Sequence, residues 1–180
     1  FVIGSLRKMF FFSLPLVPSA AAVFISGYVD RMMISHFLSL EEVGLYGMGF
    51  RVAGIVSLLL VGFNRALVPL IYKHHKEEDS PQKIADLLRF FMAFALLFFL
   101  GLSIFAQDIL WLLTNPEFYP AKNVVVFLVS AILFSQIYMF APGTAIAEKT
   151  RIIMWISVGS AVLNGLLNLI MIPWLGYIGA

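Results

Sequence analysis

The sequence of 180 residues contains no cysteine. This absence excludes a disulfide bond, a thiolate metal site and a cysteine nucleophile. Charge is also scarce, because only 12% of the residues are charged, against about 25% in soluble domains. The formal net charge of +2 is too small to indicate nucleic-acid binding. The sequence contains no glycine-rich phosphate loop, no Ser/His/Asp set and no buried carboxylate pair, so we expect no enzyme and no cofactor.

Apolar residues make up 61% of the chain, and the mean hydropathy is +0.96. A spanning helix needs about 20 mostly apolar residues. The apolar runs are continuous rather than alternating, which favours helices over barrel strands. We therefore predict an all-α, polytopic membrane protein with a bundle of about five spanning helices. These run from about Met9 to Leu38, Val43 to Ile71, Ile84 to Leu113, Val124 to Ala147 and Ile152 to Trp174.

The chain begins at Phe1 rather than Met and has no signal-peptide pattern. Its last residues, 174–180, read like the approach to another segment. We therefore expect residues 1–180 to be one transmembrane domain that forms an internal or C-terminal piece of a longer protein.

The basic residues of the connecting segments predict the orientation. Lysines and arginines cluster on one side of the predicted spans, whereas only Lys122 clearly falls on the other. The positive-inside rule makes the first side cytoplasmic. Loops 73–83 and 148–151 are then cytoplasmic, and the first span runs from inside to outside. The basic residues on the cytoplasmic side are Arg7, Lys8, Lys73, Lys76, Lys83, Lys149 and Arg151.

The first and fourth predicted spans contain prolines at which we expect kinks. Pro15 and Pro18 lie early in the first, and Pro142 lies late in the fourth, next to Gly143. A proline inside a helix removes one backbone hydrogen bond and kinks the axis. The kinks are either ordinary packing features or bending points for alternating access. The second span carries small residues at four-residue spacing, which favour close helix packing: Gly49, Ala53 and Ser57.

Four charged residues lie inside the first two predicted spans: Asp30, Arg31, Arg51 and Arg65. A charge at membrane depth costs roughly 2.5–3.5 kcal/mol on insertion scales. Such residues usually face a bundle interior or a water-filled cavity and mark functional sites. These four residues are therefore the first candidates for a site.

Arg51 and Arg65 are predicted to share one helix face. Fourteen residues on a helix place them within roughly 40° of each other and about 21 Å apart along the axis. Guanidinium groups match the geometry of phosphates, so this face could bind a diphosphate, with Asn64 beside Arg65. The alternative is that the side chains extend to the headgroups, which suits Arg65 better because the inner surface is about two turns away.

Asp30 and Arg31 are adjacent, and neighbouring residues on a helix do not face each other. We place the pair at the outer end of the first span and expect each to find a partner on another helix. Arg51 is a candidate partner for Asp30. A structural ion pair and a contact with substrate both remain open.

The histidines do not predict a metal site. His74 and His75 precede the acidic run 77–79 in one short polar loop, with no second ligand cluster elsewhere, so we interpret the segment as a solvated loop. His36 lies near the outer boundary and is interpreted as an interfacial residue rather than a proton carrier.

Several segments, in order, resemble the polysaccharide-biosynthesis flippases that translocate lipid-linked oligosaccharides, which share a superfamily with the multidrug and toxic-compound exporters. Residues 28–38 contain the Asp-Arg pair of that family after a spanning helix. Residues 42–53 resemble the "valine-glycine-any-tyrosine" start of the next helix, and residues 64–72 resemble its end. Residues 173–180 are similar to the family's "leucine-glycine-any-any-glycine-alanine" turn.

The resemblance implies that the chain is the start of the C-terminal lobe of a transporter with about twelve to fourteen spanning helices. It also implies an undecaprenyl-diphosphate-linked glycan as substrate, moved to the outer leaflet of the cell (inner) membrane by alternating access. The lipid bilayer and a missing N-terminal lobe would be the other partners. Arg51 and Arg65 would bind the diphosphate, Arg31 and Asn64 would support them, and Asp30 would pair or titrate. Proton or sodium coupling stays open.

Three alternatives compete with this interpretation. An ion-coupled multidrug exporter of the same superfamily would favour carboxylates for cationic drugs, whereas arginines predominate among the intramembrane charges here. A membrane-embedded glycan transferase would need a catalytic carboxylate or histidine cluster at one interface, which the sequence lacks. A non-transporting scaffold also remains open.

Overall fold

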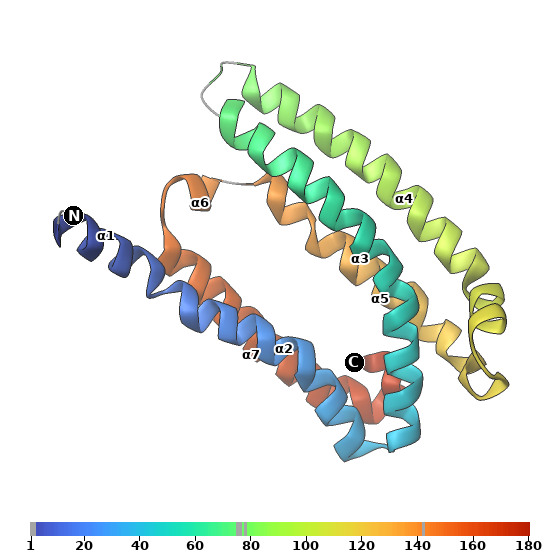
Figure 1. The fold of residues 1–180 in the computed structure, drawn as a ribbon. Helices are drawn as coiled ribbons and strands as arrows, with labels where there is room; N and C mark the ends of the chain where they lie inside the picture. The colour runs from blue at the N-terminus through green and yellow to red at the C-terminus, as the bar shows by residue number, and fades with distance from the viewer. Residues whose placement is uncertain (1–2, 75–76, 78, 142) are drawn as a thin grey trace. The chain divides into compact units, whose positions relative to one another are not determined.

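The computed structural model describes residues 3–74, 77, 79–141 and 143–180, and all regular elements among these residues are helices (Figure 1). The elements, with η for a 3-10 helix, are α1 Ile3–Ser13, α2 Leu16–Phe37, α3 Leu40–His74, α4 Ser80–Leu113, η1 Pro116–Ala121, α5 Lys122–Ser135, η2 Ile137–Phe140, α6 Gly143–Ile146, α7 Thr150–Leu175 and η3 Gly176–Gly179.

Within the described residues, five helical segments are long and apolar enough to cross a membrane, which confirms the predicted all-α, multi-pass membrane fold. Their bounds are Leu6–Phe37, Leu40–Ile71, Ser80–Leu113, Pro116–Phe140 and Thr150–Gly179.

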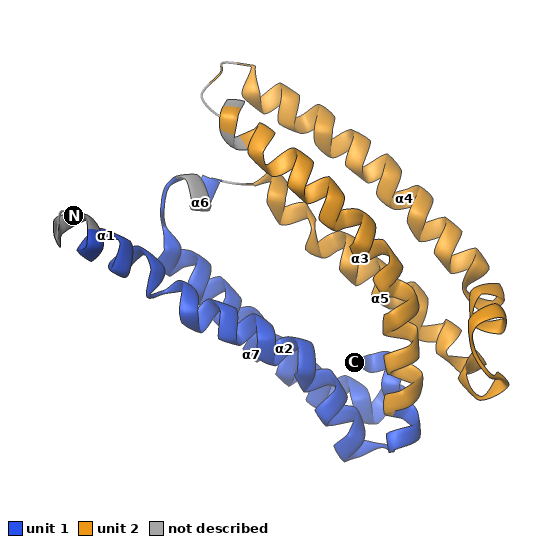
Figure 2. Cartoon of the chain, viewed as in Figure 1, with its two compact units in different colours: residues 1–42, 142–180 blue, residues 43–141 orange. Residues whose placement is uncertain are grey.

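The helices form two compact units, which are described separately (Figure 2). Unit 1 comprises residues 1–42 and 142–180 and is built mainly from α2 and α7. Unit 2 comprises residues 43–141 and contains most of α3 together with α4 and α5.

In unit 1, α2 and α7 pack side by side in parallel (Figure 1). The Ser19 hydroxyl donates to the Ser157 hydroxyl at 2.8 Å, and these residues are 138 positions apart. The hydrogen bond between Asn168 and Asp30 has the same offset of 138 positions. A constant offset requires two helices that run in the same direction without a register shift. The predicted topology agrees, since the first and fifth spans would cross in the same direction.

The first predicted span is broken at Pro15, which confirms a kink there. Helix α1 ends at Ser13 and α2 begins at Leu16. The backbone N–H of Leu14 still donates to the Phe10 carbonyl at 2.9 Å. Pro15 has no N–H with which to continue the ladder, and its ring crowds the preceding turn. Pro18 is tolerated because it falls in the first turn of α2, where backbone N–H groups lack helical partners anyway.

The side chain of Ser39 caps the N-terminus of α3. The backbone N–H of Glu42 donates to the Ser39 hydroxyl at 3.3 Å, and this hydroxyl donates to the Glu42 carboxylate at 3.5 Å. The helix then continues unbroken for 35 residues. Arg51 and Arg65 therefore lie on one continuous helix, as their predicted spacing requires.

The fourth spanning segment is present over Pro116–Phe140, so its bounds differ from the predicted 124–147, and it is not one continuous helix. Helix α5 ends at Ser135, and the chain continues as the short helices η2 and α6. The Gln136 N–H donates to the Leu133 carbonyl at 3.1 Å, a tighter turn than in an α-helix. Further on, Ala141 precedes a proline and leaves the helical region, with φ −118° and ψ 59°. The predicted kink at Pro142 itself lies outside the described residues.

The core of unit 2 joins α3, α4 and η2 through phenylalanines. The Phe63 ring on α3 lies 5.5 Å from Phe91 and stacks on Phe94 at 6.0 Å. Phe91, which is fully buried, also contacts the ring of Phe140 at 5.3 Å. These contacts fix the second half of α3, in chain order, against its neighbours.

Helix α3 also approaches α5 closely at Gly49, which is buried. A Cβ atom at this position would overlap the Val124 side chain and lie 3.3 Å from the Ala121 carbonyl oxygen. The predicted role of Gly49 in close helix packing is therefore confirmed.

The turn after α7 explains the glycines of the final motif. Gly176 ends the helix with φ 67°, a left-handed conformation that glycine adopts without strain. Gly179 packs against the Met171 carbonyl, where a Cβ atom would clash with backbone. Both glycines are thus required by the local geometry.

We expect Gly49→Ala to lower the free energy of unfolding by about 1–3 kcal/mol, because Val124 is buried and has little room to move. The matched control is Gly54→Ala on the same helix, where nothing lies within 4 Å of the new Cβ. That change should be neutral or stabilising by up to about 1 kcal/mol, since alanine favours helices. Unfolding of both purified variants in detergent measures the difference, and equal stabilities would contradict the packing at Gly49.

Candidate functional site

A carboxylate lies between α2 and α7 in unit 1 and accepts hydrogen bonds from two amides. Nδ2 of Asn168 donates to Oδ1 of Asp30 at 2.6 Å, and Nδ2 of Asn164 is 3.4 Å from the same oxygen. Asn168 is only 2% exposed, whereas Asp30 and Asn164 are half-buried. The two asparagines are four residues apart, so both project from one face of α7. We name these three residues the Asp30 cluster.

Two exposed tryptophans on α7 indicate the depth of the Asp30 cluster. Trp155 and Trp174 lie near opposite ends of the helix and are separated by about 28 Å along its axis. Tryptophans gather at membrane–water interfaces, and the hydrocarbon core is about 30 Å thick. Asn164 lies midway between the two tryptophans along α7, and this spacing favours a place for the Asp30 cluster near the middle of that span. The predicted position of Asp30 at the outer end of the first span stays a prediction.

Asp30 finds its partners on another helix, as predicted, but they are asparagines of α7. The guanidinium of Arg31 donates to the Gly27 carbonyl of its own helix at 2.8 Å. Asp30 belongs to unit 1 and Arg51 to unit 2. The suggested pair between them stays a prediction.

The two arginines of α3 are both exposed. The salt bridges recorded in the described part of the chain lie within residues 77–89 and involve neither Arg51 nor Arg65. If the span Leu40–Ile71 is centred in the bilayer, Arg51 lies about 7 Å from the midplane and Arg65 about 14 Å. Half of the hydrocarbon core is about 15 Å. Arg65 can therefore extend to the headgroups, whereas Arg51 needs a polar surrounding at depth.

Asn64 forms hydrogen bonds within unit 2. Its Nδ2 donates to the Leu60 carbonyl at 3.0 Å and to Oε1 of Gln136 at 2.7 Å. Gln136 is the C-cap residue of α5. Asn64 thus ties α3 to the break after α5, and its predicted contact with substrate stays a prediction.

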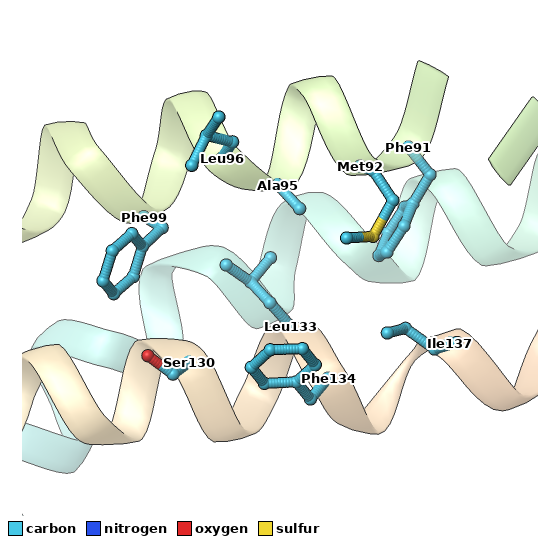
Figure 3. A pocket seen from close by; sticks show the side chains of 9 residues that line it. All are labelled: Phe91, Met92, Ala95, Leu96, Phe99, Ser130, Leu133, Phe134 and Ile137. Atoms are coloured by element: carbon cyan, nitrogen blue, oxygen red, sulfur yellow. The ribbon is translucent and has the colours of Figure 1, made fainter. Parts of the chain in front are cut away.

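A groove of about 270 Å³ lies between α4 and the segment α5–η2 in unit 2 (Figure 3). Its polar residue, Ser130, already donates its hydroxyl to the Val126 carbonyl at 2.8 Å. The groove therefore offers little to a sugar or a phosphate, and it contains none of the predicted site residues. Its lining comprises Phe91, Met92, Ala95, Leu96, Phe99, Ser130, Leu133, Phe134 and Ile137.

The loop between α3 and α4 carries exposed ion pairs. Lys83 Nζ lies 2.8 Å from the Glu77 carboxylate and 3.0 Å from that of Asp79. This geometry agrees with a solvated loop at these residues, while His75 and Glu78 lie outside the described residues. In the part of the chain that the structure describes, no group of three or more His, Cys, Asp or Glu residues could hold a metal ion. His36 is exposed near the end of α2 and packs edge-on against Phe37 at 5.0 Å.

Sequence reasoning missed Asn164, Asn168 and Gln136. A signal for the first two existed, because asparagines four residues apart in an otherwise apolar span form a polar stripe on one helix face. Gln136 carried no comparable signal. Its importance follows from the end of α5 and from its contact with Asn64, both of which require the tertiary structure.

Comparison with known proteins gives a family match. Residues 1–75 match the family described as polysaccharide biosynthesis protein. An Lsg locus protein of Haemophilus influenzae is 27% identical over 94% of this chain and 44% of its own length. An uncharacterized membrane protein of the same organism is 31% identical over 84% of this chain and 40% of its own length.

A third relative carries a functional description. A probable low-salt glycan biosynthesis flippase, Agl15, of Haloferax volcanii is 24% identical over 97% of this chain and 38% of its own length. The chain therefore spans less than half the length of these relatives. No solved structure matches it. The family resemblance predicted from the sequence motifs is confirmed by these matches.

Proposed function

We propose that this chain, a relative of the polysaccharide biosynthesis flippases, is part of a transporter that moves a polyprenyl-diphosphate-linked oligosaccharide across the cytoplasmic membrane. The family match over residues 1–75 and the similarity to a probable glycan biosynthesis flippase support transport rather than enzymatic catalysis. The five spanning segments supply the membrane setting that a lipid-linked substrate requires.

The observation that carries the proposal is the charge on α3. Arg51 and Arg65 lie on one unbroken helix, within roughly 40° of the same face, and both are exposed. A guanidinium is always protonated and offers five N–H donors in a planar fork that matches phosphate oxygens. At membrane depth such a group needs an anion or water to offset its desolvation. A diphosphate supplies the matching charge and geometry.

The two depths suggest how the headgroup would be transferred. Arg65 is nearer the predicted cytoplasmic end of α3 and would meet the diphosphate first, while Arg51 would hold it at depth. Arg31 and Asn64 would support this path. The break at Pro15 and the break after Ser135 are where α2 and α5 could bend during alternating access. At each break the helical hydrogen bonding of the backbone is interrupted, so the segments on its two sides can rotate relative to each other.

We propose that loops 73–83 and 148–151 face the cytoplasm, following the lysine and arginine bias. Cysteines introduced as Glu41→Cys and Glu117→Cys should then react with an impermeant thiol reagent added to intact cells. Glu77→Cys should react only after the membrane is opened. All three positions are exposed in the structure, and this chain has no native cysteine to label. Reaction at position 77 from outside would refute the orientation, and with it the proposal that Arg65 meets the diphosphate before Arg51.

In the full-length protein, we expect Arg51→Ala to reduce glycan export at least about tenfold at normal protein abundance. A charge-assisted hydrogen bond to phosphate contributes about 1.5–3 kcal/mol. Arg51→Lys should restore only part of the activity, because lysine keeps the charge but loses the bidentate fork. The matched control is Arg89→Ala, which removes an exposed arginine already paired with Asp86 at 2.8 Å. Normal export by Arg51→Ala would leave the diphosphate assignment without its main support.

A binding experiment distinguishes this function from multidrug export, for which a carboxylate-lined cavity would be expected. The purified full-length protein should bind a polyprenyl-diphosphate glycan at least about tenfold more tightly than the same glycan without its diphosphate. Its overexpression should give no resistance to lipophilic cationic dyes, since arginines repel cations. Dye resistance together with equal affinity for the two glycans would favour the exporter instead.

A further inference from the structure

We infer that the side-chain oxygen of Asn64 accepts a hydrogen bond from the sugar next to the diphosphate, so that Asn64 contacts the glycan and not the phosphate. The inference rests on the proposed function for the class of the ligand. It assigns two parts of one headgroup to two neighbouring residues of α3, the diphosphate to Arg65 and the sugar to Asn64.

The orientation of the Asn64 amide is set by its contact with the backbone. The side-chain nitrogen and oxygen of an asparagine have nearly the same shape, so their hydrogen-bond partners identify them. The Leu60 carbonyl oxygen lies 3.0 Å from the Asn64 amide and can only accept a hydrogen bond. The atom of Asn64 that faces Leu60 is therefore the donor, Nδ2.

The other hydrogen of this Nδ2 is also used. Nδ2 donates to Oε1 of Gln136 at 2.7 Å. Nε2 of Gln136 donates to the Ser135 hydroxyl at 3.2 Å, and that hydroxyl donates to the Ile132 carbonyl at 2.7 Å. This chain of hydrogen bonds ends at a backbone carbonyl, which only accepts. The Gln136 amide therefore has a defined orientation too, with its oxygen toward Asn64.

The oxygen of the Asn64 amide is the part of the side chain that stays available. Among the described residues, the hydrogen bonds recorded for Asn64 all use Nδ2. Oδ1 is not one of the buried polar atoms that lack a partner, so it is accessible at the surface of this half-buried side chain. An amide oxygen has two lone pairs and only accepts hydrogen bonds. A ligand group that binds it must supply an O–H or N–H.

This polarity favours a sugar over a phosphate. The oxygens of an ionised diphosphate accept hydrogen bonds and carry negative charge, so they repel an amide oxygen. The hydroxyl and acetamido groups of a sugar supply the required O–H and N–H donors. Arg65 has the opposite character, because a guanidinium has donors only. The two side chains therefore match complementary parts of a glycosyl diphosphate.

The positions of Asn64 and Arg65 fit one ligand that carries both parts. Consecutive residues of a helix are about 1.5 Å apart along the axis and about 100° apart around it. If the span Leu40–Ile71 is centred in the bilayer, the two residues lie about 13 and 14 Å from the midplane. The hydrocarbon core ends at about 15 Å, which is where the headgroup of a lipid begins. A diphosphate at Arg65 then has its first sugar on the neighbouring sector of the helix surface, at Asn64.

Gln136 acts in this arrangement as a positioning residue. Its Oε1 holds one hydrogen of the Asn64 Nδ2 and thereby keeps Oδ1 directed away from α5. Without this acceptor, the Asn64 amide would have one hydrogen bond fewer to oppose its rotation. The end of α5 at Ser135 thus has a second consequence, because it brings the Gln136 side chain to α3.

The test measures the binding of four synthetic lipids to the purified full-length protein in detergent. They are a polyprenol and a polyprenyl diphosphate, each with and without one N-acetylhexosamine. The wild type should bind the sugar-bearing lipid of each pair more tightly. Asn64→Leu should weaken binding of both sugar-bearing lipids about threefold to tenfold, the loss expected for one neutral hydrogen bond, and leave the sugar-free lipids unaffected.

Three further variants serve as comparisons. Arg65→Ala should show the other pattern, with binding of both diphosphate lipids weakened at least about tenfold and binding of the other two unchanged. Gln136→Met keeps a side chain of similar length without the acceptor, and it should reduce the preference for sugar in the same direction as Asn64→Leu. Asn115→Leu removes an exposed amide that caps no helix, and it should keep all four affinities.

Three results would overturn the inference. They are a wild type without preference for the sugar, an Asn64→Leu variant that binds all four lipids normally, and an equal loss for both diphosphate lipids in that variant, which would assign Asn64 to the phosphate.

A measurement on the wild type covers the case in which Asn64→Leu fails to fold. A sugar methylated at every hydroxyl and at its amide nitrogen has no donor left, so it should bind no better than the sugar-free lipid. Undiminished binding of the methylated sugar would contradict the role of Asn64 as an acceptor. Failure of the proposed function has a different signature, namely equal binding of the lipids with and without diphosphate. The effect of Asn64→Leu on the sugar is then still measured with the two polyprenols.

Discussion

A charge inside hydrocarbon must be neutralised or hydrated, and this constraint governs the polar side chains of the chain. The apolar residues on the helix surfaces can face lipid without penalty. Asp30, Arg51 and Arg65 cannot. The positions of these few residues therefore determine which helix faces turn inward and which helices must pack together. The paired arrangement of α2 and α7 is a direct consequence.

The pairing of α2 with α7 combines close packing with polar contacts. Small residues, Ser19 and Ala22, allow α7 to approach. The hydrogen bonds of Ser19 and Asp30 then fix the register, since both join residues 138 positions apart. Hydrogen bonds between membrane helices contribute only about 0.6 kcal/mol on average. Their role here is to select one register among several apolar alternatives of similar packing energy.

Much of this fold could be predicted from the sequence, because hydrocarbon thickness sets helix length. The five apolar runs correspond to five spanning segments, and Pro15 lies at the break between α1 and α2. The end of α5 at Ser135 could not be predicted, because the apolar run continues through η2 to Phe140. The break depends on the geometry around Gln136, which contacts Asn64 across 72 residues of sequence. Such a contact leaves no local pattern.

The candidate site was likewise predictable from the sequence only in part. The spacing of Arg51 and Arg65 is a property of one helix, so the sequence was sufficient to place them on one face. The partners of Asp30 were not predictable by the same means, because they come from a helix that begins 120 residues later. Charged residues inside an apolar run are the stronger signal in the sequence, although the neutral asparagines do as much to define the environment of Asp30.

The carboxylate of Asp30 and the guanidinium of Arg51 differ in the groups that compensate their charge. The fold supplies Asp30 with two amides from α7. It does not supply Arg51 with a salt bridge in the described residues, although Arg51 lies deeper in its span than Arg65. A charge that the fold compensates is suited to holding helices together. A charge that the fold leaves exposed at depth is suited to an anion that binds and is then released. This difference argues that a diphosphate should be sought at the arginines of α3 rather than at Asp30.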